Sequence, residues 1–221
     1  MGLRKYSLKS IILFIAILAG IALNHSRAYA AQTKTMVVAG GCFWCVKSDF
    51  ERVRGVVKAV SGFTGGTTKN PTYKQVSAGR TGHFEAVQIT YDPARISYES
   101  LLKLFIMSID PTDGGGQFCD RGDSYRTAIF VSNPREKAIA EATLRYARRA
   151  LHRPIRTQIL PASRFYVAGP PHQDYYKGTR RVLTRFGIKR RSQAYQTYRK
   201  ACGRDARVKR LWGANAPFIR H

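Results

Sequence analysis

The stretch from Met36 to Val53 constrains the fold most strongly, because a strand pattern gives way to a helix pattern within it. Met36-Val37-Val38-Ala39 is a short apolar run typical of a buried strand. Two glycines follow and mark a sharp turn. The next apolar residues recur at spacings of three and four, which predicts a helix. They are Phe43, Val46, Phe50 and Val53. We therefore expect a strand–turn–helix unit with Cys42 at the start of the helix.

Cys42 occupies a position at which a thiol ionises readily. Unpaired backbone N–H groups and the positive end of the helix dipole stabilise a thiolate at a helix N-terminus, and the thiolate is the nucleophilic form. Cys45 follows in the Cys-x-x-Cys spacing of redox pairs. A buried, inert cysteine is the alternative interpretation of Cys42. Its neighbours favour the reactive one.

The first thirty residues have the pattern of an export signal. Residues 11–23 are an unbroken apolar run, followed by the small-x-small sequence Ala28-Tyr29-Ala30. The basic residues that precede the run are Arg4, Lys5 and Lys9. A membrane span needs about 20 apolar residues, so a membrane-anchored form is less favoured. We expect cleavage after Ala30, a periplasmic location, and a single catalytic domain at residues 31–221 that ends in a basic C-terminal tail.

The chain is strongly basic, with 38 Lys and Arg against 13 Asp and Glu and a formal net charge of +25. Such a balance could indicate nucleic-acid binding, but no binding motif accompanies it, and an exported protein rarely meets nucleic acid. We expect no specific nucleic-acid partner. The leading interpretation is a solvated basic face without a dedicated partner, and a weak attraction to anionic envelope surfaces is the alternative. No internal repeat or domain boundary is evident, and a monomer is expected.

Four cysteines are present: Cys42, Cys45, Cys119 and Cys202. In an oxidising compartment an even number suggests disulfides. A zinc site is disfavoured, because no second Cys or His pair lies at ligand spacing. We expect no metal.

Strand and helix patterns alternate along the rest of the chain. Their order predicts an α+β fold, a two-layer α/β sandwich with a small mixed sheet and a ferredoxin-like core. The expected strands are 56–60, 83–91, 125–131 and 155–160, and the expected helices are 97–109, 134–150 and 175–186. The expected loops are the polar stretch 62–71 and the glycine-rich stretch 110–122.

Glu85 is a candidate general acid. It shares a strand face with Val87 and Ile89, so its carboxyl should be desolvated. Desolvation raises a carboxyl pKa and keeps a proton available near neutral pH. The alternative is an edge-strand glutamate that faces water. Tyr73 and Tyr125 are weaker candidates, because most tyrosines are packing residues.

Several short blocks of sequence, taken together, resemble one known family. In their order and separations they match the A class of peptide methionine sulfoxide reductases, over about residues 35–176. The blocks are Gly41–Cys45, Gly62–Gly66, Asn70–Tyr73, Gly82–Val87, Asp120–Gly122 with Tyr125-Arg126, and His172-Gln173. The resemblance implies reduction of the S epimer of methionine sulfoxide in oxidised proteins and peptides; reduction of free methionine sulfoxide stays open. It also implies an external thioredoxin-like or dithiol reductant and no bound cofactor.

The same resemblance implies a role for each site residue. Cys42 attacks the sulfoxide sulfur and Glu85 protonates the departing oxygen. The remaining implied roles are hydrogen bonds to that oxygen from Tyr73 and Tyr125, ordering of the site by Asp120, and an apolar wall for the methyl group from Phe43 and Trp44. Cys42 would become a sulfenic acid, which condenses with a second thiol.

Two cysteines are candidates for that second thiol. Cys45 lies three residues after Cys42 on the expected first helical turn, close enough to react first. Cys202 lies in the C-terminal tail, and C-terminal cysteines often play this part in the resembled family. We expect Cys42–Cys45 to form first and Cys202 to relay the bond outward. Direct capture by Cys202 stays open, and Cys119 is interpreted as a packing residue.

Two other functions compete with reduction of a sulfoxide. A thiol–disulfide oxidoreductase would use the Cys-x-x-Cys pair, but Phe43 and Trp44 between the cysteines would bury the pair behind aromatic rings. A non-enzymatic envelope-binding module would explain the charge and leave the cysteine, glutamate and tyrosine blocks unexplained.

Overall fold

The computed structural model describes residues 32–219. The chain divides into two units, residues 1–33 and 34–221. The expected export signal lies outside the described residues, so the signal, its cleavage and the domain at 31–221 stay predictions. Within residues 32–219, no helix has both the length and the hydrophobicity to cross a membrane.

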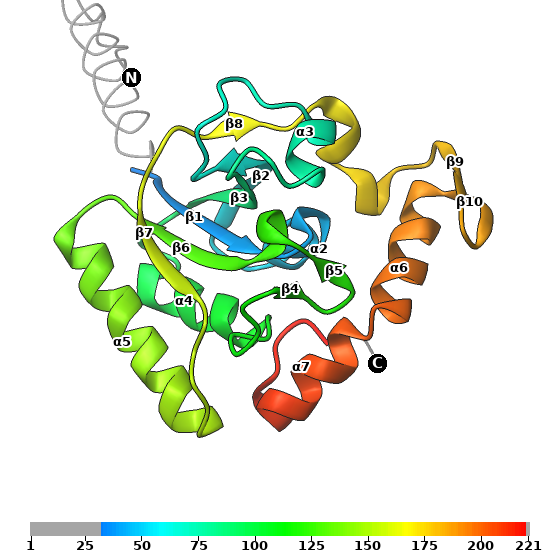
Figure 1. Ribbon diagram of the computed structural model, residues 1–221. Helices are drawn as coiled ribbons and strands as arrows, with labels where there is room; N and C mark the ends of the chain where they lie inside the picture. The colour runs from blue at the N-terminus through cyan, green and yellow to red at the C-terminus, as the bar shows by residue number, and fades with distance from the viewer. Residues whose placement is uncertain (1–31, 220–221) are drawn as a thin grey trace, which may run out of the picture. The chain divides into compact units, whose positions relative to one another are not determined.

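A six-stranded sheet forms the centre of the second unit, in the order β7-β6-β1-β3-β2-β8 (Figure 1). Its strands are β1 (Lys34–Gly40), β2 (Val56–Thr64), β3 (Phe84–Tyr91), β6 (Thr127–Val131), β7 (Gln158–Pro161) and β8 (Tyr166–Val167). Neighbouring strands are antiparallel except β6 and β7, which run parallel. The sheet is therefore mixed, as predicted.

Alternation along the strands separates two apolar clusters. Met36 and Val38 of β1 belong to the main core, whereas Ala39 belongs to a smaller cluster that includes Phe84 and Phe130. The helices that contact the sheet are α2 (Phe43–Phe50), α4 (Tyr98–Met107) and α5 (Pro134–Leu151). Their buried apolar residues lie in the main core, which confirms the two-layer α+β class.

Side-chain caps start the two longer helices at the predicted places. Ser97 Oγ accepts a hydrogen bond of 3.0 Å from the Ser100 N–H at the start of α4. Asn133 Oδ1 accepts one of 2.9 Å from the Glu136 N–H at the start of α5, and Pro134 occupies the first helical position. Both predicted helices are confirmed.

The loop predictions need two corrections. β2 continues through residues 61–64, which are buried, so the polar loop starts later than predicted. A Cβ at Gly62 would lie 2.4 Å from the Phe165 ring, so only glycine fits where β8 pairs with β2. Within the glycine-rich loop, β4 (Gly116–Gln117) and β5 (Asp120–Arg121) form a short hairpin. The short helix α3 (Tyr73–Ser77) carries Tyr73.

The prediction for the C-terminal part was wrong. Residues 175–186 are not one helix: a 3-10 turn, η3 (Tyr175–Lys177), precedes a hairpin of β9 (Arg181–Thr184) and β10 (Gly187–Arg190). Gly187 has φ +86°, and the Phe186 N–H donates to Thr184 Oγ1 at 3.0 Å, which reverses the chain.

The basic C-terminal segment is folded over its described residues, up to residue 219. Two helices follow the hairpin, α6 (Arg191–Ala201) and α7 (Arg204–Trp212). Tyr195, Val208 and Trp212 are buried, so this segment packs onto the rest of the fold.

Candidate active site

Cys42 lies between β1 and α2, as the N-cap residue of α2, and is partly exposed. Gly41 before it has φ +78°, and a Cβ there would lie 2.5 Å from Gln117 Cβ. The turn that presents Cys42 therefore requires glycine for both backbone conformation and space.

Glu85 lies on β3 with only 2% of its surface exposed. The Phe43 N–H at the start of α2 donates a hydrogen bond of 3.0 Å to Glu85 Oε2, which ties β3 to the Cys42 turn. Burial raises the pKa of Glu85 to about 8; the charge of Asp120 adds to the rise and the Phe43 N–H opposes it. The carboxyl is thus protonated at neutral pH, as its strand face suggested.

Two tyrosine hydroxyls accompany this carboxyl. Tyr73 on α3 and Tyr125 in the 3-10 turn η1 (Asp123–Tyr125) are hydrogen-bonded to each other. Burial, and next the charge of Glu85, raises the pKa of both phenols well above the usual range. Both therefore keep their protons as hydrogen-bond donors beside Cys42. Tyr125 reaches this place from a turn rather than from the predicted strand.

The two free thiols form a hydrogen-bonded pair. The hydrogen bond with Cys45, followed by burial, raises the pKa of Cys42 well above its usual value. The same bond lowers the pKa of Cys45 to about 7, assisted by the positive charges of Arg204 and Arg199. The negative charge of the resting pair therefore lies on Cys45. This differs from the expectation of a Cys42 thiolate, because the shared hydrogen bond and burial keep the proton on Cys42 while the arginines stabilise the charge on Cys45.

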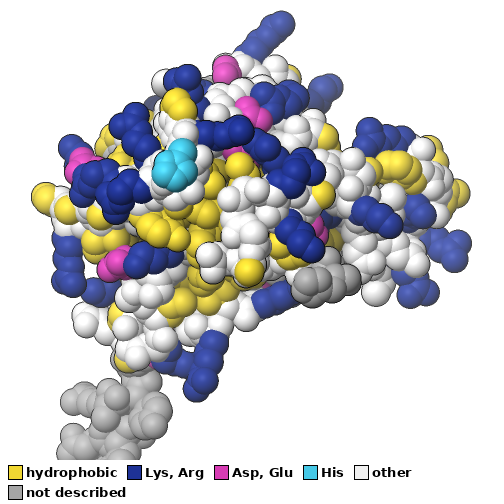
Figure 2. Space-filling model, turned by 90° about the horizontal axis from the view of Figure 1, so that it is seen from below, with side chains coloured by type: hydrophobic (Ala, Val, Ile, Leu, Met, Phe, Trp, Pro, Cys, Tyr) yellow, Lys and Arg dark blue, Asp and Glu magenta, His cyan; other side chains and the backbone are white. Residues whose placement is uncertain are grey.

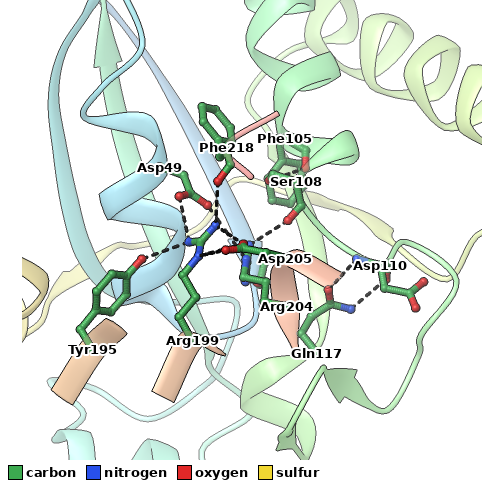
Figure 3. Close-up of polar contacts among 11 residues, drawn as sticks. Asp49, Phe105, Ser108, Asp110, Gln117, Tyr195, Arg199, Arg204, Asp205 and Phe218 are labelled. Carbon is green, nitrogen blue, oxygen red and sulfur yellow. Dashed lines mark hydrogen bonds and ion pairs between the residues drawn. The ribbon is translucent and has the colours of Figure 1, made fainter. Parts of the chain in front are cut away.

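A buried ionic cluster supplies those positive charges (Figure 3). Arg199 on α6 donates from Nη1 to Asp49 Oδ1 at 2.9 Å and from Nε to Asp205 at 2.9 Å. Arg204 donates from Nη2 to the Ser108 carbonyl at 3.0 Å. Arg199 and Arg204 are 5% and 2% exposed. Their charges are offset by carboxylates and carbonyls, as buried charges require.

Sequence reasoning missed this cluster. Its one signal was the spacing of Asp49, four residues after Cys45 on the predicted helix, which places both on one helix face. Nothing in the sequence indicated that arginines from the C-terminal segment would meet that aspartate.

The two aromatic residues between the cysteines have different surroundings. The Trp44 ring stacks on Tyr175 with centroids 3.8 Å apart, and it lines a cavity beside Cys42. Phe43 is 1% exposed and packs against Phe63 and Tyr73, with centroids 5.8 Å and 6.2 Å away. Trp44 thus forms the wall, and Phe43 supports the site from within the core.

All four cysteines of the chain line this cavity, whose volume is about 390 Å³. Cys119 and Cys202 form a disulfide with Cα atoms 4.9 Å apart, which joins the β4–β5 hairpin to the turn between α6 and α7. Cys119 is therefore exposed and bonded, and the packing interpretation was wrong. Cys119 Sγ also lies 4.0 Å from Asp120 Oδ1, so the disulfide and Asp120 share one wall.

Comparisons with known proteins match most of the chain. A family model described as peptide methionine sulfoxide reductase matches residues 34–206. Peptide methionine sulfoxide reductase MsrA 2 of Caulobacter vibrioides is 47% identical over 204 residues, 92% of this chain and 97% of that protein. The MsrA of Bacillus subtilis is 48% identical over 178 residues, 80% of this chain and 94% of that protein.

Solved structures are also similar. Methionine sulfoxide reductase A of Corynebacterium diphtheriae is 35% identical with a TM-score of 0.59, covering 65% of this chain and 73% of that one. Mxr1 of Saccharomyces cerevisiae in reduced form is 27% identical with a TM-score of 0.63, covering 66% of this chain and 85% of that one.

Proposed function

We infer the roles of individual side chains from the premise that this chain belongs to the peptide methionine sulfoxide reductase family. It is an oxidoreductase of the A class that reduces peptide-bound methionine (S)-sulfoxide to methionine. The observation that carries the assignment of roles is a protonated, buried carboxyl, Glu85, hydrogen-bonded to the backbone N–H next to Cys42.

In the first step the Cys42 sulfur attacks the sulfoxide sulfur. The oxygen is a poor leaving group until it is protonated, and Glu85 supplies that proton. Tyr73 and Tyr125 donate hydrogen bonds to the same oxygen while charge develops on it. Methionine leaves, the oxygen ends on Cys42 as a sulfenic acid, and one sulfur has been reduced for each sulfur oxidised.

Activation of Cys42 uses its partner thiol. The hydrogen bond in the pair, with negative charge on Cys45, makes Cys42 the donor. Transfer of that proton to Cys45 converts Cys42 into the nucleophilic thiolate at the moment of attack. Asp120 contributes order, because its carboxyl acts electrostatically on Cys42 and contacts Cys119 of the Cys119–Cys202 bond.

Cys45 then captures the Cys42 sulfenic acid, forming a Cys42–Cys45 disulfide and releasing water. An external dithiol protein of the thioredoxin kind reduces the Cys119–Cys202 bond and is itself oxidised to a disulfide. The freed Cys202 thiol then attacks the Cys42–Cys45 disulfide, and Cys119 displaces the mixed disulfide, which re-forms Cys119–Cys202 and leaves Cys42 and Cys45 as thiols. The exposure of Cys119 and the burial of Cys45 support this order, since a protein reductant reaches Cys119 more readily than Cys45.

Mass spectrometry after a single turnover tests these assignments. Fully reduced enzyme would receive one equivalent of an S-sulfoxide peptide without reductant, and its thiols would be alkylated at successive times. We expect methionine release with an early Cys42–Cys45 disulfide and a later Cys119–Cys202 disulfide. Enzyme treated the same way without sulfoxide measures air oxidation. An initial Cys42–Cys202 bond in place of Cys42–Cys45 would contradict capture by Cys45.

The thiol–disulfide oxidoreductase alternative is disfavoured by the burial of Cys45 and by the Trp44–Tyr175 stack in the wall of the same cavity. An insulin-reduction assay beside a sulfoxide assay separates the two functions. Faster turnover of the insulin disulfide than of the sulfoxide would favour the alternative.

The cellular setting is part of the proposal. The leader pattern supports export to the periplasm with cleavage after Ala30. Loss of the four basic leader residues reduces the net charge only from +25 to +21, which supports weak attraction to anionic envelope surfaces. We infer a monomeric enzyme that acts on oxidised proteins, peptides and free methionine sulfoxide without a bound cofactor. Amino-terminal sequencing of envelope-fraction protein should begin at Ala31, and a full-length N-terminus in the membrane pellet would indicate an anchor.

A further inference from the structure

The β9–β10 hairpin exposes an apolar pair. Leu183 and Ile188 lie directly opposite each other across the two strands and are 84% and 69% exposed. Residues two apart in a strand share a face, so Arg181 and Arg190, which are also opposite each other, lie on this same outer face. Val182 and Lys189 occupy the other face and are partly buried. We call Arg181, Leu183, Ile188 and Arg190 the outer face of the hairpin.

The stability of the fold does not account for this outer face. Two like charges directly opposite across strands repel, and an exposed apolar pair gains nothing from burial. Over residues 32–219, neither Arg181 nor Arg190 forms an ion pair with an acidic side chain. The stretch 180–191 holds six Lys or Arg residues and no Asp or Glu. Figure 2 shows hydrophobic and basic side chains side by side at its right edge, where Figure 1 places this hairpin.

The hairpin also forms part of the wall of the catalytic cavity. Leu183, Thr184 and Arg185 line the same cavity as Cys42. The Arg185 guanidinium lies over the rings of Phe186 and Tyr198, at 4.8 Å and 5.4 Å from their centroids. Leu183 therefore connects the cavity to the outer face, and a chain that enters the cavity with one residue would cross the hairpin with the next ones.

We propose that the outer face of the hairpin binds an acidic, extended segment of the polypeptide substrate, adjacent to the methionine sulfoxide that enters the cavity. This inference rests on the proposed function. Arg181 and Arg190 pair with carboxylates of the segment, and Leu183 with Ile188 contacts an apolar side chain between them. Charge complementarity favours an acidic occupant. Because the outer face is continuous with the cavity, the substrate itself is a better occupant than an anionic lipid surface. Insertion into a lipid surface needs a larger apolar area than two side chains provide.

Peptide kinetics test the proposal. Two peptides of equal length would carry one central methionine (S)-sulfoxide, one with acidic and one with basic flanks. N-acetyl methionine sulfoxide amide, which is too short to reach the outer face, serves as the reference substrate. We expect a lower KM for the acidic peptide, with kcat similar for both. In the Arg181→Gln/Arg190→Gln variant the KM for the acidic peptide should rise about fivefold, the scale of two exposed ion pairs, with turnover of the reference substrate unchanged.

A matched control removes the same charge elsewhere. Arg148 and Arg149 lie exposed on α5, which Figure 1 shows on the opposite side of the fold from β9 and β10. The Arg148→Gln/Arg149→Gln variant should keep the peptide KM of the parent. Ile188→Ser tests the apolar contact without changing charge and should also raise the peptide KM.

Three results would overturn the proposal. An equal KM rise in the α5 control would mean that net charge alone attracts the peptide. An equal loss on the reference substrate would mean that the arginines only support the cavity. Binding of the hairpin to anionic vesicles, without any preference between peptides, would assign the outer face to lipid. Failure to reduce even the reference substrate would instead refute the proposed function.

Discussion

The sheet–helix junction around Cys42 and the C-terminal segment after residue 174 form the same active site by different means. The junction is held by apolar side chains that alternate along β1 and β3 and recur along α2. The C-terminal segment is held by buried arginines, a disulfide and a few apolar residues such as Tyr195 and Trp212. Acid chemistry lies in the first region, and charge control of the thiols comes from the second.

The sheet–helix junction supplies Cys42, the proposed nucleophile that attacks the sulfoxide. Cys42→Ser should abolish sulfoxide reduction, because a serine hydroxyl is not a nucleophile at neutral pH without an activating base. Methionine release measured with excess dithiothreitol tests this. Cys45→Ser is the control: without reductant it should still release about one methionine per enzyme, more slowly because Cys42 lacks its proton acceptor. Complete loss of methionine release in both variants would place the reacting sulfur in doubt.

Replacement of Arg199 should destabilise the C-terminal segment. Arg199→Met leaves Asp49 as a buried charge with weaker compensation, so we expect about 3–5 kcal/mol lower stability. Urea unfolding measures the change. Arg145→Met is the matched control, since Arg145 is exposed and its ion pair with Glu141 spans 4.0 Å; it should cost less than about 1 kcal/mol. Similar losses in both variants would mean that the buried cluster does not hold the segment.

Replacement of Glu85 tests the acid chemistry of the sheet–helix junction alone. Glu85→Gln keeps the size of the side chain but has no acidic proton, and the chemical step should slow about 10²-fold or more. Rapid-quench kinetics with saturating peptide measures that step. Near-parent turnover in this variant would rule out Glu85 as the proton donor.

The pH dependence should report on both regions at once. Below about 7 Cys45 gains a proton and the thiol pair loses its negative charge; above about 8 Glu85 loses the proton it donates. We therefore expect a bell-shaped profile of kcat/KM with its acidic limb from the pair and its alkaline limb from Glu85.

Two variants assign the limbs of that profile. Glu85→Gln should remove the alkaline limb from the residual activity. Cys45→Ser should move the acidic limb to higher pH, because Cys42 then titrates without its partner. An identical acidic limb in Cys45→Ser and the parent would contradict the assignment of the negative charge to the Cys42–Cys45 thiol pair.

The sequence was informative where apolar periodicity builds the structure. The strand–turn–helix around Cys42 and the buried face of Glu85 followed from spacing alone, because alternation and the helical repeat determine which side chains turn inward. The capped starts of α4 and α5 followed from Ser97 and from Asn133-Pro134 for the same local reason.

Where charged residues enter the interior, that reasoning failed. Arg199 and Arg204 break the apolar pattern of α6 and α7, so neither helix was predicted. The charge on Cys45 depends on the same arginines, which are more than 150 residues away in sequence, and no local pattern carries such a contact. The Cys119–Cys202 bond has a sequence separation of 83 and is equally non-local.

The stacking of Trp44 on Tyr175 has a spectroscopic consequence. Trp44 is one of two tryptophans in the chain, and its indole lines the cavity that holds the reacting thiols. A disulfide or a bound peptide in that cavity changes the polarity and the quenching groups around the indole. Trp212, the second tryptophan, lies at the end of α7, where Trp212→Phe would remove its emission from the background. The fluorescence of Trp44 then becomes an intrinsic optical readout of each step of the catalytic cycle, with no added label.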